Sequence, residues 1–312
     1  MFTVRSISAI TRTISSSLSG ALRTPLYRCL ATNGEKFKIS YNYGHGDSVL
    51  IGSTIGQALN KVSDEVGDQL AFVFCHQNIR RTFLETNQES DQLAASLLEL
   101  GLRPGERLAI WSSNCYEWVL TQLAAAKAGL ILVRTLRRNE KLREVKELDS
   151  KIQFDDPANI QFTSGTTGKP KAATLSHFNL INNAVVLSNR IIIPGVVSIV
   201  VNYTFITVLS YLVWHAFGSV GGVITTIIHR KLAVFPSPHF DPLATLKAIE
   251  KERCTLVMGT PTMFIDIVNH PDVDKFDLTS LQGALVGASP CPVELWKEIE
   301  QKMGITTIFV SF

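Results

Sequence analysis

Near its midpoint the chain reads Asn159-Ile-Gln-Phe-Thr-Ser-Gly-Thr-Thr-Gly-Lys-Pro-Lys171, an apolar strand pattern that runs into a loop rich in glycine, hydroxyl and lysine groups. Glycine lets the backbone approach a phosphate and point successive N–H groups at it. The hydroxyls add donors, and lysine supplies positive charge. A Walker A loop is excluded, because only two residues separate Gly165 from Gly168 and Pro170 follows the lysine. The stretch predicts a phosphate-binding loop, with an ordinary polar turn as the alternative.

Helix and strand patterns alternate on both sides of this loop. Helices are expected over residues 85–100, 116–127, 177–187, 242–253, 262–268 and 292–303. Strands are expected over residues 107–111, 130–133, 159–162, 255–258, 284–286 and 306–310. Ser176 and Asp241 stand where helix N-caps belong, and Pro242 suits a first helical position. The alternation predicts an α/β fold with parallel strands.

Residues 191–228 contain no Asp, Glu, Lys or Arg, and this span is long enough to cross a membrane. Residues 191–212 are rich in Val, Ile, Thr and Tyr, which prefer strands, and Pro194-Gly195 interrupts them. A buried, sheet-rich core is therefore the favoured interpretation, and a membrane span is the alternative.

Charge is concentrated at the start of the chain. The formal net charge is +3, and four arginines precede the first acidic residue, Glu35, so that the remainder carries −1 (3 − 4 = −1). A nucleic-acid binder would need a basic patch in its folded part, so that class is excluded. The five cysteines form no C-x-x-C pair, which argues against a zinc site or a disulfide scaffold and predicts small buried side chains.

Residues 1–30 have the composition of a targeting segment. They hold four arginines, six serines and no acidic residue, which is typical of a mitochondrial transit peptide, and the alternative is a disordered basic tail. Arg28-Cys-Leu-Ala31 resembles a matrix-protease site with cleavage after Leu30. We expect a transit peptide over residues 1–30 and location in the mitochondrial matrix.

The loop at Thr163–Lys171 resembles the signature of the adenylate-forming (AMP-binding) superfamily, which includes acyl-CoA synthetases, luciferases and peptide-synthetase adenylation domains. Other stretches resemble further parts of the same family: Thr82-Phe83, Gly105-Glu-Arg-Leu108, Asn114 with Trp118, Ala128-Gly129, His215-Ala-Phe-Gly218, Gly259-Thr-Pro-Thr262 and Gly287-Ala-Ser-Pro290. Within the superfamily, Asn159–Val310 is similar to the mitochondrial medium-chain fatty acyl-CoA synthetases.

The resemblance implies an ATP-dependent acyl-CoA ligase of fatty acid metabolism, with ATP, CoA and Mg²⁺ as cofactors and a fatty acid as substrate. The residues it implies for phosphate binding are Thr163, Ser164, Gly165, Thr166, Thr167, Gly168, Lys169, Pro170 and Lys171. Those it implies against the adenine are Gly287, Ala288, Ser289 and Pro290. Lys171 and His215 are its catalytic candidates, with His215 at the acyl or phosphate end of the cleft or, equally, a core histidine.

The chain also departs from the family pattern. It ends at Phe312, where the family continues into Gly-Thr-Thr-Glu, so the resemblance implies that residues 31–312 are a partial AMP-binding domain: an incomplete large N-terminal domain without the small C-terminal one. Three residues of the family pattern have no counterpart in this sequence: the Mg²⁺-binding Glu, the ribose-binding Asp and the C-terminal Lys. No residue is therefore expected to bind the metal. A charged stretch of about 25 residues before Asn159 and the apolar run 196–214 replace family segments, and Ala172 stands at a family Gly. A catalytically impaired form with part of the ATP and acyl cleft is therefore the alternative function.

Overall fold

The computed structural model describes residues 49–110, 112–133, 142–163, 171–190, 206–209 and 215–311. The chain divides into two units, Met1–Asp47 and Ser48–Phe312, and all described residues belong to the second. The expected transit peptide therefore lies outside the described residues.

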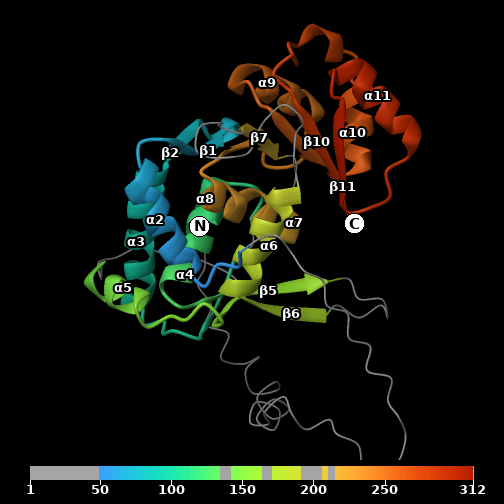
Figure 1. The fold of residues 1–312 in the computed structure, drawn as a ribbon. Coiled ribbons are helices and arrows are strands. Elements are labelled where there is room, and N and C mark those ends of the chain that lie inside the picture. Colours follow the sequence, from blue (N-terminus) through green and yellow to red (C-terminus); the bar gives the residue numbers. More distant parts are fainter. Residues whose placement is uncertain are drawn as a thin grey trace, which may run out of the picture. The chain divides into compact units, whose positions relative to one another are not determined.

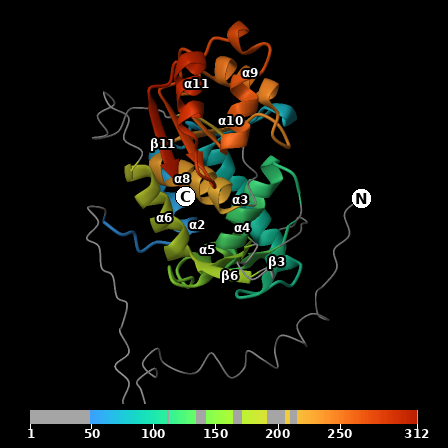
Figure 2. The same ribbon diagram turned by 90° about the vertical axis from the view of Figure 1, so that its right-hand side faces the viewer.

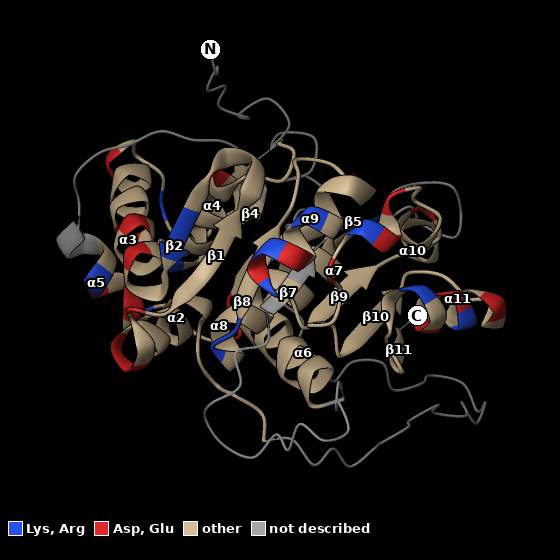
Figure 3. Cartoon of the chain, turned by 90° about the horizontal axis from the view of Figure 1, so that it is seen from above, with Lys and Arg blue, Asp and Glu red and all other residues tan. Residues whose placement is uncertain are grey.

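The larger sheet of the described chain has seven strands in the order β11-β10-β9-β7-β8-β1-β2. Neighbours run parallel except β1 and β2, which are antiparallel. The strands are β1 Leu70–Phe74, β2 Ile79–Thr82, β7 Ile206–Leu209, β8 Leu232–Phe235, β9 Leu256–Gly259, β10 Gly283–Gly287 and β11 Thr307–Ser311. β1, β8, β9 and β10 carry no charged side chain and are tan throughout in Figure 3, as expected for strands covered on both faces.

A second sheet of described residues has the order β3-β4-β5-β6. Its strands are β3 Arg107–Ala109, β4 Ile131–Val133, β5 Pro157–Thr163 and β6 Lys171–Ser176. β3, β4 and β5 are parallel, and β6 is antiparallel to β5. The predicted strand–helix–strand unit is confirmed, because α4 (Tyr116–Lys127) connects β3 to β4. The sequence pattern does not predict β6, whose pairing depends on a partner strand rather than on its own alternation.

Helices cover both faces of the larger sheet. The other helices of the described residues are α2 Ile55–Val66, α3 Phe83–Glu99, α5 Leu142–Asp149, α6 His177–Arg190, α7 Ala216–Gly218, the π-helix η2 Ser219–Ile224, α8 Thr225–His229, α9 Pro242–Glu252, α10 Pro261–Val268 and α11 Val293–Met303. Short 3₁₀ turns occur at η1 Cys75–Gln77 and η3 Val273–Lys275. Figures 1 and 2 show α9, α10 and α11 grouped together, apart from α2, α3 and α4.

The core consists of two clusters, one on each face of the larger sheet. Phe72 and Phe74 of β1 pack into the cluster formed with α2, α3, α4 and α6, whereas Val73 between them packs with α9, α10 and α11. Successive side chains of a strand point to opposite faces, so one short strand serves both clusters. The Phe74 and Phe235 rings stack at 4.3 Å between centroids.

Predicted caps are confirmed where they can be checked. Asp241 accepts a hydrogen bond from Ala244 N at 2.7 Å, and the Ser176 hydroxyl accepts one from Asn179 N at 3.2 Å. Each side chain satisfies an N–H group that has no partner within its helix, which fixes where the helix begins. The predicted elements otherwise match the observed ones within two residues at their ends, except that α6 continues three residues beyond the predicted end at Leu187.

The prediction of a sheet-rich segment over residues 191–228 is wrong for much of the described part. Residues 206–209 do form β7, but α7, η2 and the start of α8 make residues 216–228 helical. All side chains of η2 are buried, so packing against α6 and α8 outweighs the strand preference of Val, Ile and Thr. Residues 191–205 and 210–214 lie outside the described residues.

Two further expectations concern the membrane span and the cysteines. No helix within the described ranges combines the length and apolar character needed to cross a bilayer. Cys254 is buried as predicted, whereas Cys75, Cys115 and Cys291 are only half-buried. Cys29 lies outside the described residues.

Candidate functional site

The β5–β6 hairpin carries the predicted phosphate-binding loop. Thr163 pairs with Lys171 across the hairpin, and Phe162 pairs with Ala172. The two ends of the loop are therefore neighbours at the open end of a ladder, with Lys171 exposed. Ala172 lies in the extended strand, where its side chain costs nothing, so the difference from the family glycine does not strain the hairpin. The other loop candidates, Ser164, Gly165, Thr166, Thr167, Gly168, Lys169 and Pro170, lie outside the described residues.

The predicted adenine-binding stretch follows the carboxyl end of β10. Gly287 is buried and pairs with Ser311 at the end of β11, so two parallel strands end side by side. Ala288 then adopts φ = +71°, a left-handed conformation that is uncommon for a residue with a Cβ. This sharp turn exposes Ala288, Ser289 and Pro290 beyond the sheet. Ligands of open α/β sheets bind outside the carboxyl ends of the strands, which is where these residues lie.

His215 begins the short helix α7. Its Nδ1 accepts a hydrogen bond from Phe217 N at 3.2 Å, and its imidazole is exposed rather than part of the core. The alternative reading of His215 as a core histidine is therefore wrong.

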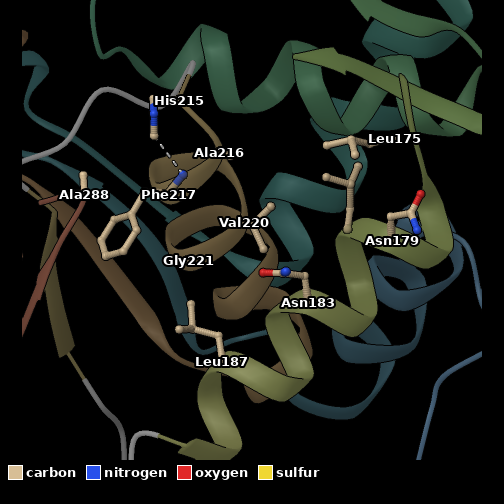
Figure 4. Close-up of a pocket in the computed structure, with 11 residues that line it drawn as sticks. Leu175, Asn179, Asn183, Leu187, His215, Ala216, Phe217, Val220, Gly221 and Ala288 are labelled. Carbon is tan, nitrogen blue, oxygen red and sulfur yellow. Dashed lines mark hydrogen bonds between the residues drawn. The ribbon is translucent and has the colours of Figure 1, made fainter. Parts of the chain in front are cut away.

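His215 and Ala288 line the same pocket, whose volume is about 320 Å³. Figure 4 shows them at one side of it, with the dashed line from His215 to the Phe217 backbone. The remaining lining residues come from the end of β6, from α6, and from α7 with η2: Leu175, Asn179, Leu180, Asn183, Leu187, Ala216, Phe217, Val220 and Gly221. Most of them are apolar, so the pocket suits a hydrocarbon chain with a polar end.

Helix α6 forms one wall of the pocket and is hydrogen-bonded to Ile51, before α2, and to Ile55, the first residue of α2. Asn182 accepts a hydrogen bond from Ile51 N at 2.7 Å and donates one to Ile51 O at 3.0 Å. His177 Nδ1 accepts one from Ile55 N at 3.1 Å. Burial lowers the pKa of His177 to about 4, so its ring is neutral and this acceptor is present at neutral pH.

The described residues contain no group of three or more His, Cys, Asp or Glu side chains that could hold a metal ion such as Mg²⁺. Mg²⁺ requires near-octahedral oxygen coordination, usually with carboxylates and substrate phosphates. The side chains around Ala288 and His215 that line the pocket include no carboxylate. The described residues therefore do not fit the ion by themselves.

Comparison with known proteins decides the family. The family model described as AMP-binding enzyme matches residues 59–146 and 134–312. The chain belongs to the AMP-binding enzyme family. Both the hairpin loop and the turn after β10 lie within the second matched range.

Several curated relatives of this chain are named as acyl-CoA ligases. The chain is 34% identical over 353 aligned positions to the medium-chain acyl-CoA ligase ACSF2, mitochondrial, of Danio rerio. The alignment covers 88% of this chain and 57% of that relative. The chain therefore spans a little over half the length of the relative that it matches.

Solved structures show the same fold. The inhibitor-bound N-terminal domain of FACL13 from Mycobacterium tuberculosis superimposes with a TM-score of 0.68 at 20% identity, covering 83% of this chain and 75% of that one. ATP-bound MatB from Rhodopseudomonas palustris gives a TM-score of 0.64 at 20% identity, covering 81% and 58%. The chain thus has the α/β fold of the N-terminal domain of adenylate-forming enzymes, as predicted.

The sequence does not predict that α6 forms a wall of the pocket. The residues concerned share one face of the helix at intervals of four: Asn179, Asn183 and Leu187. Residues four apart lie above one another on a helix. That spacing could have identified the stripe, but not η2 opposite, since its helical conformation contradicts its residue preferences.

Proposed function

We propose that the chain activates a fatty carboxylate with ATP and transfers the acyl group to coenzyme A. A carboxylate oxygen attacks the α-phosphorus of ATP, forming acyl-adenylate as pyrophosphate leaves. The thiol sulfur of coenzyme A, losing its proton, then attacks the acyl carbonyl and displaces AMP to give the thioester. The single observation that carries the proposal is the apolar pocket that has His215 and Ala288 at one side.

The pocket supports the acyl part of this assignment. A volume of about 320 Å³ falls at the lower end of the range for small-molecule sites, about 300–1,000 Å³. Each methylene removed from water contributes about 0.8 kcal/mol, so an alkyl chain gains most by entering between α6 and η2. A chain of medium length is the proposed substrate, as the name of the Danio rerio relative states for that protein.

The polar residues support the nucleotide part. Lys171 and Thr163 bracket the glycine-rich loop, and the positive charge of Lys171 would stabilise phosphate oxygens as charge develops on them. Gly287 to Pro290 would contact the adenine at the strand ends. His215 would hold the carboxylate end of the substrate. Mg²⁺ enters no step here, because the described residues do not supply its ligands.

The first prediction concerns Lys171. With the full chain, ATP and octanoate, we expect octanoate-dependent pyrophosphate release, and Lys171→Ala should lower its rate about 100-fold because one preorganised charge contact is lost. Pyrophosphate would be quantified by mass spectrometry. Lys151→Ala is the matched control, because Lys151 is exposed and lies outside both the loop and the pocket.

Calorimetric titration with octanoate completes this test. Octanoate binding together with pyrophosphate release supports the ligase. Octanoate binding without release above the Lys171→Ala level would overturn ligase activity for this chain and support a form that retains only part of the cleft. Absence of octanoate binding would overturn the acyl pocket itself.

We also propose that the chain acts in the mitochondrial matrix. The support is the composition of residues 1–30, with four arginines and no acidic residue, and the word mitochondrial in the name of the relative. Fused to a reporter, residues 1–30 are expected to direct import into isolated mitochondria with cleavage near Leu30. Replacing the four arginines with glutamine should abolish import, and import that survives this change would contradict the proposal.

A further inference from the structure

Three polar side chains line the otherwise apolar pocket: Asn179, Asn183 and His215. Two of them are engaged by their own chain. Asn179 Oδ1 accepts hydrogen bonds from Ser176 N at 3.0 Å and from the Ser176 hydroxyl at 3.1 Å, which fixes the start of α6. His215 Nδ1 accepts from Phe217 N. Their orientation is therefore explained without a ligand.

Asn183 differs from both. It lies one helical turn beyond Asn179 and one turn before Leu187 on the pocket face of α6. Its amide makes no hydrogen bond with any residue that the structure describes. Figure 4 shows the amide pointing from α6 across the pocket toward the helix that carries Val220 and Gly221. Its neighbour Asn182 is bonded to Ile51 in both directions, so helix packing accounts for Asn182 and not for Asn183.

The wall opposite Asn183 is apolar and includes Val220 and Gly221 of η2. A Cβ at Gly221 would lie 3.1 Å from Met258 Cε and 3.4 Å from Leu187 Cδ2. Gly221 therefore packs closely against Met258 and Leu187, and a side chain there would have to displace them. An acyl chain that enters the pocket would pass beside the Asn183 amide and displace part of the water around it.

Displacing that water has opposite consequences for two kinds of acyl chain. Asn183 is exposed, so a plain alkyl chain removes only part of the water bound to its amide and offers no hydrogen bond in return. A chain with a hydroxyl or oxo group at the same depth replaces that water with a direct hydrogen bond. The expected preference is that of one hydrogen bond at an exposed amide.

We propose that Asn183 is a specificity-determining residue that selects acids carrying a hydroxyl or oxo group part-way along the acyl chain. This rests on the proposed function, because it assumes that the acyl chain enters this pocket. The Asn183 amide hydrogen-bonds the hydroxyl or oxo group, while the apolar residues of α6 and η2 contact the hydrocarbon on either side of that group.

The test compares decanoate with hydroxydecanoic acids that differ only in which carbon carries the hydroxyl, each titrated calorimetrically into the full chain. We expect one positional isomer to bind about tenfold more tightly than decanoate, which is the effect of one hydrogen bond gained by a partly exposed amide. In Asn183→Leu this preference should disappear, and decanoate should bind at least as tightly as before.

Asn189→Leu is the matched control, because Asn189 is on the same helix and exposed but does not line the pocket. It should keep the wild-type preference. Equal affinities for all the acids in the wild type, or a preference that survives Asn183→Leu, would overturn the role of Asn183 while the acyl pocket stands. Failure of decanoate and of every hydroxy acid to bind would instead overturn the proposed function.

Discussion

Replacing Lys127 with alanine is expected to lower the free energy of unfolding by about 3–5 kcal/mol, the usual cost of removing one partner from a buried charge pair. Lys127 is the last residue of α4, and its side chain is only 2% exposed. Its ammonium donates hydrogen bonds to Asp91 Oδ1 at 2.6 Å, Asn60 Oδ1 at 2.8 Å and Asn87 Oδ1 at 2.5 Å. One side chain therefore joins α4 to α2 and α3.

The ammonium is satisfied but costly to bury. Desolvation lowers the pKa of Lys127, and the Asp91 carboxylate acts in the opposite direction. All three of its protons have acceptors, which is the full capacity of a lysine. Without the ammonium, those half-buried acceptors lose their donor, and the space of the lysine stem is left empty.

Guanidinium unfolding followed by circular dichroism would measure the effect. Lys127→Met keeps the apolar stem and should cost less than Lys127→Ala, the difference being the packing of the stem. Lys251→Ala is the matched control, because Lys251 also lies in the last turn of a helix, α9, but is exposed, and it should cost about 0.5 kcal/mol or less. If the Lys127 and Lys251 variants lost equal stability, the buried network would have no energetic role.

Lys127 also illustrates what the sequence predicts and what it does not. The helix over residues 116–127 follows from local spacing and a glycine stop, and the observed α4 has the same ends. A lysine in a last helical turn is ordinarily solvated and favoured by the helix dipole. Its burial arises from α2 and α3, whose acceptors are 36 or more residues away in the chain, so local pattern gives no sign of it.

Part of the candidate site can likewise be predicted from the sequence, and part depends on the assembled fold. The hydroxyl, glycine and lysine string and the Gly287–Pro290 stretch stand out in the sequence because their composition is unusual. That His215 and Ala288 line one pocket depends on the packing of α7 and η2 beside the end of β10, over segments that are remote in sequence. The apolar segment containing η2 is helical because it is enclosed, and enclosure is a property of the assembled fold rather than of Val220 or Ile224.

Lowering the pH from 7 to 5 is expected to cost the protein about 2 kcal/mol through His177 alone. The imidazole is buried, and burial lowers its pKa from 6.5 to about 4. Between those values the unfolded chain binds a proton that the folded chain does not, so stability falls as pH falls. The contribution is complete above pH 6.5 and is lost by about pH 4, with a total of about 3 kcal/mol.

His177→Asn tests this directly, because the amide oxygen of asparagine can accept from Ile55 N in place of Nδ1 but takes up no proton in this range. The variant should unfold with a shallower dependence on pH between 7 and 5, measured by urea titration at each pH. Some dependence should persist, since burial also lowers the pKa of His229 to about 4. His239→Asn removes an exposed histidine and should leave the slope as it is in the wild type.

An unchanged slope in His177→Asn would mean that protonation of His177 does not oppose folding. A shallower slope would show that protonation of His177, whose neutral ring accepts from Ile55 N at the start of α2, opposes folding.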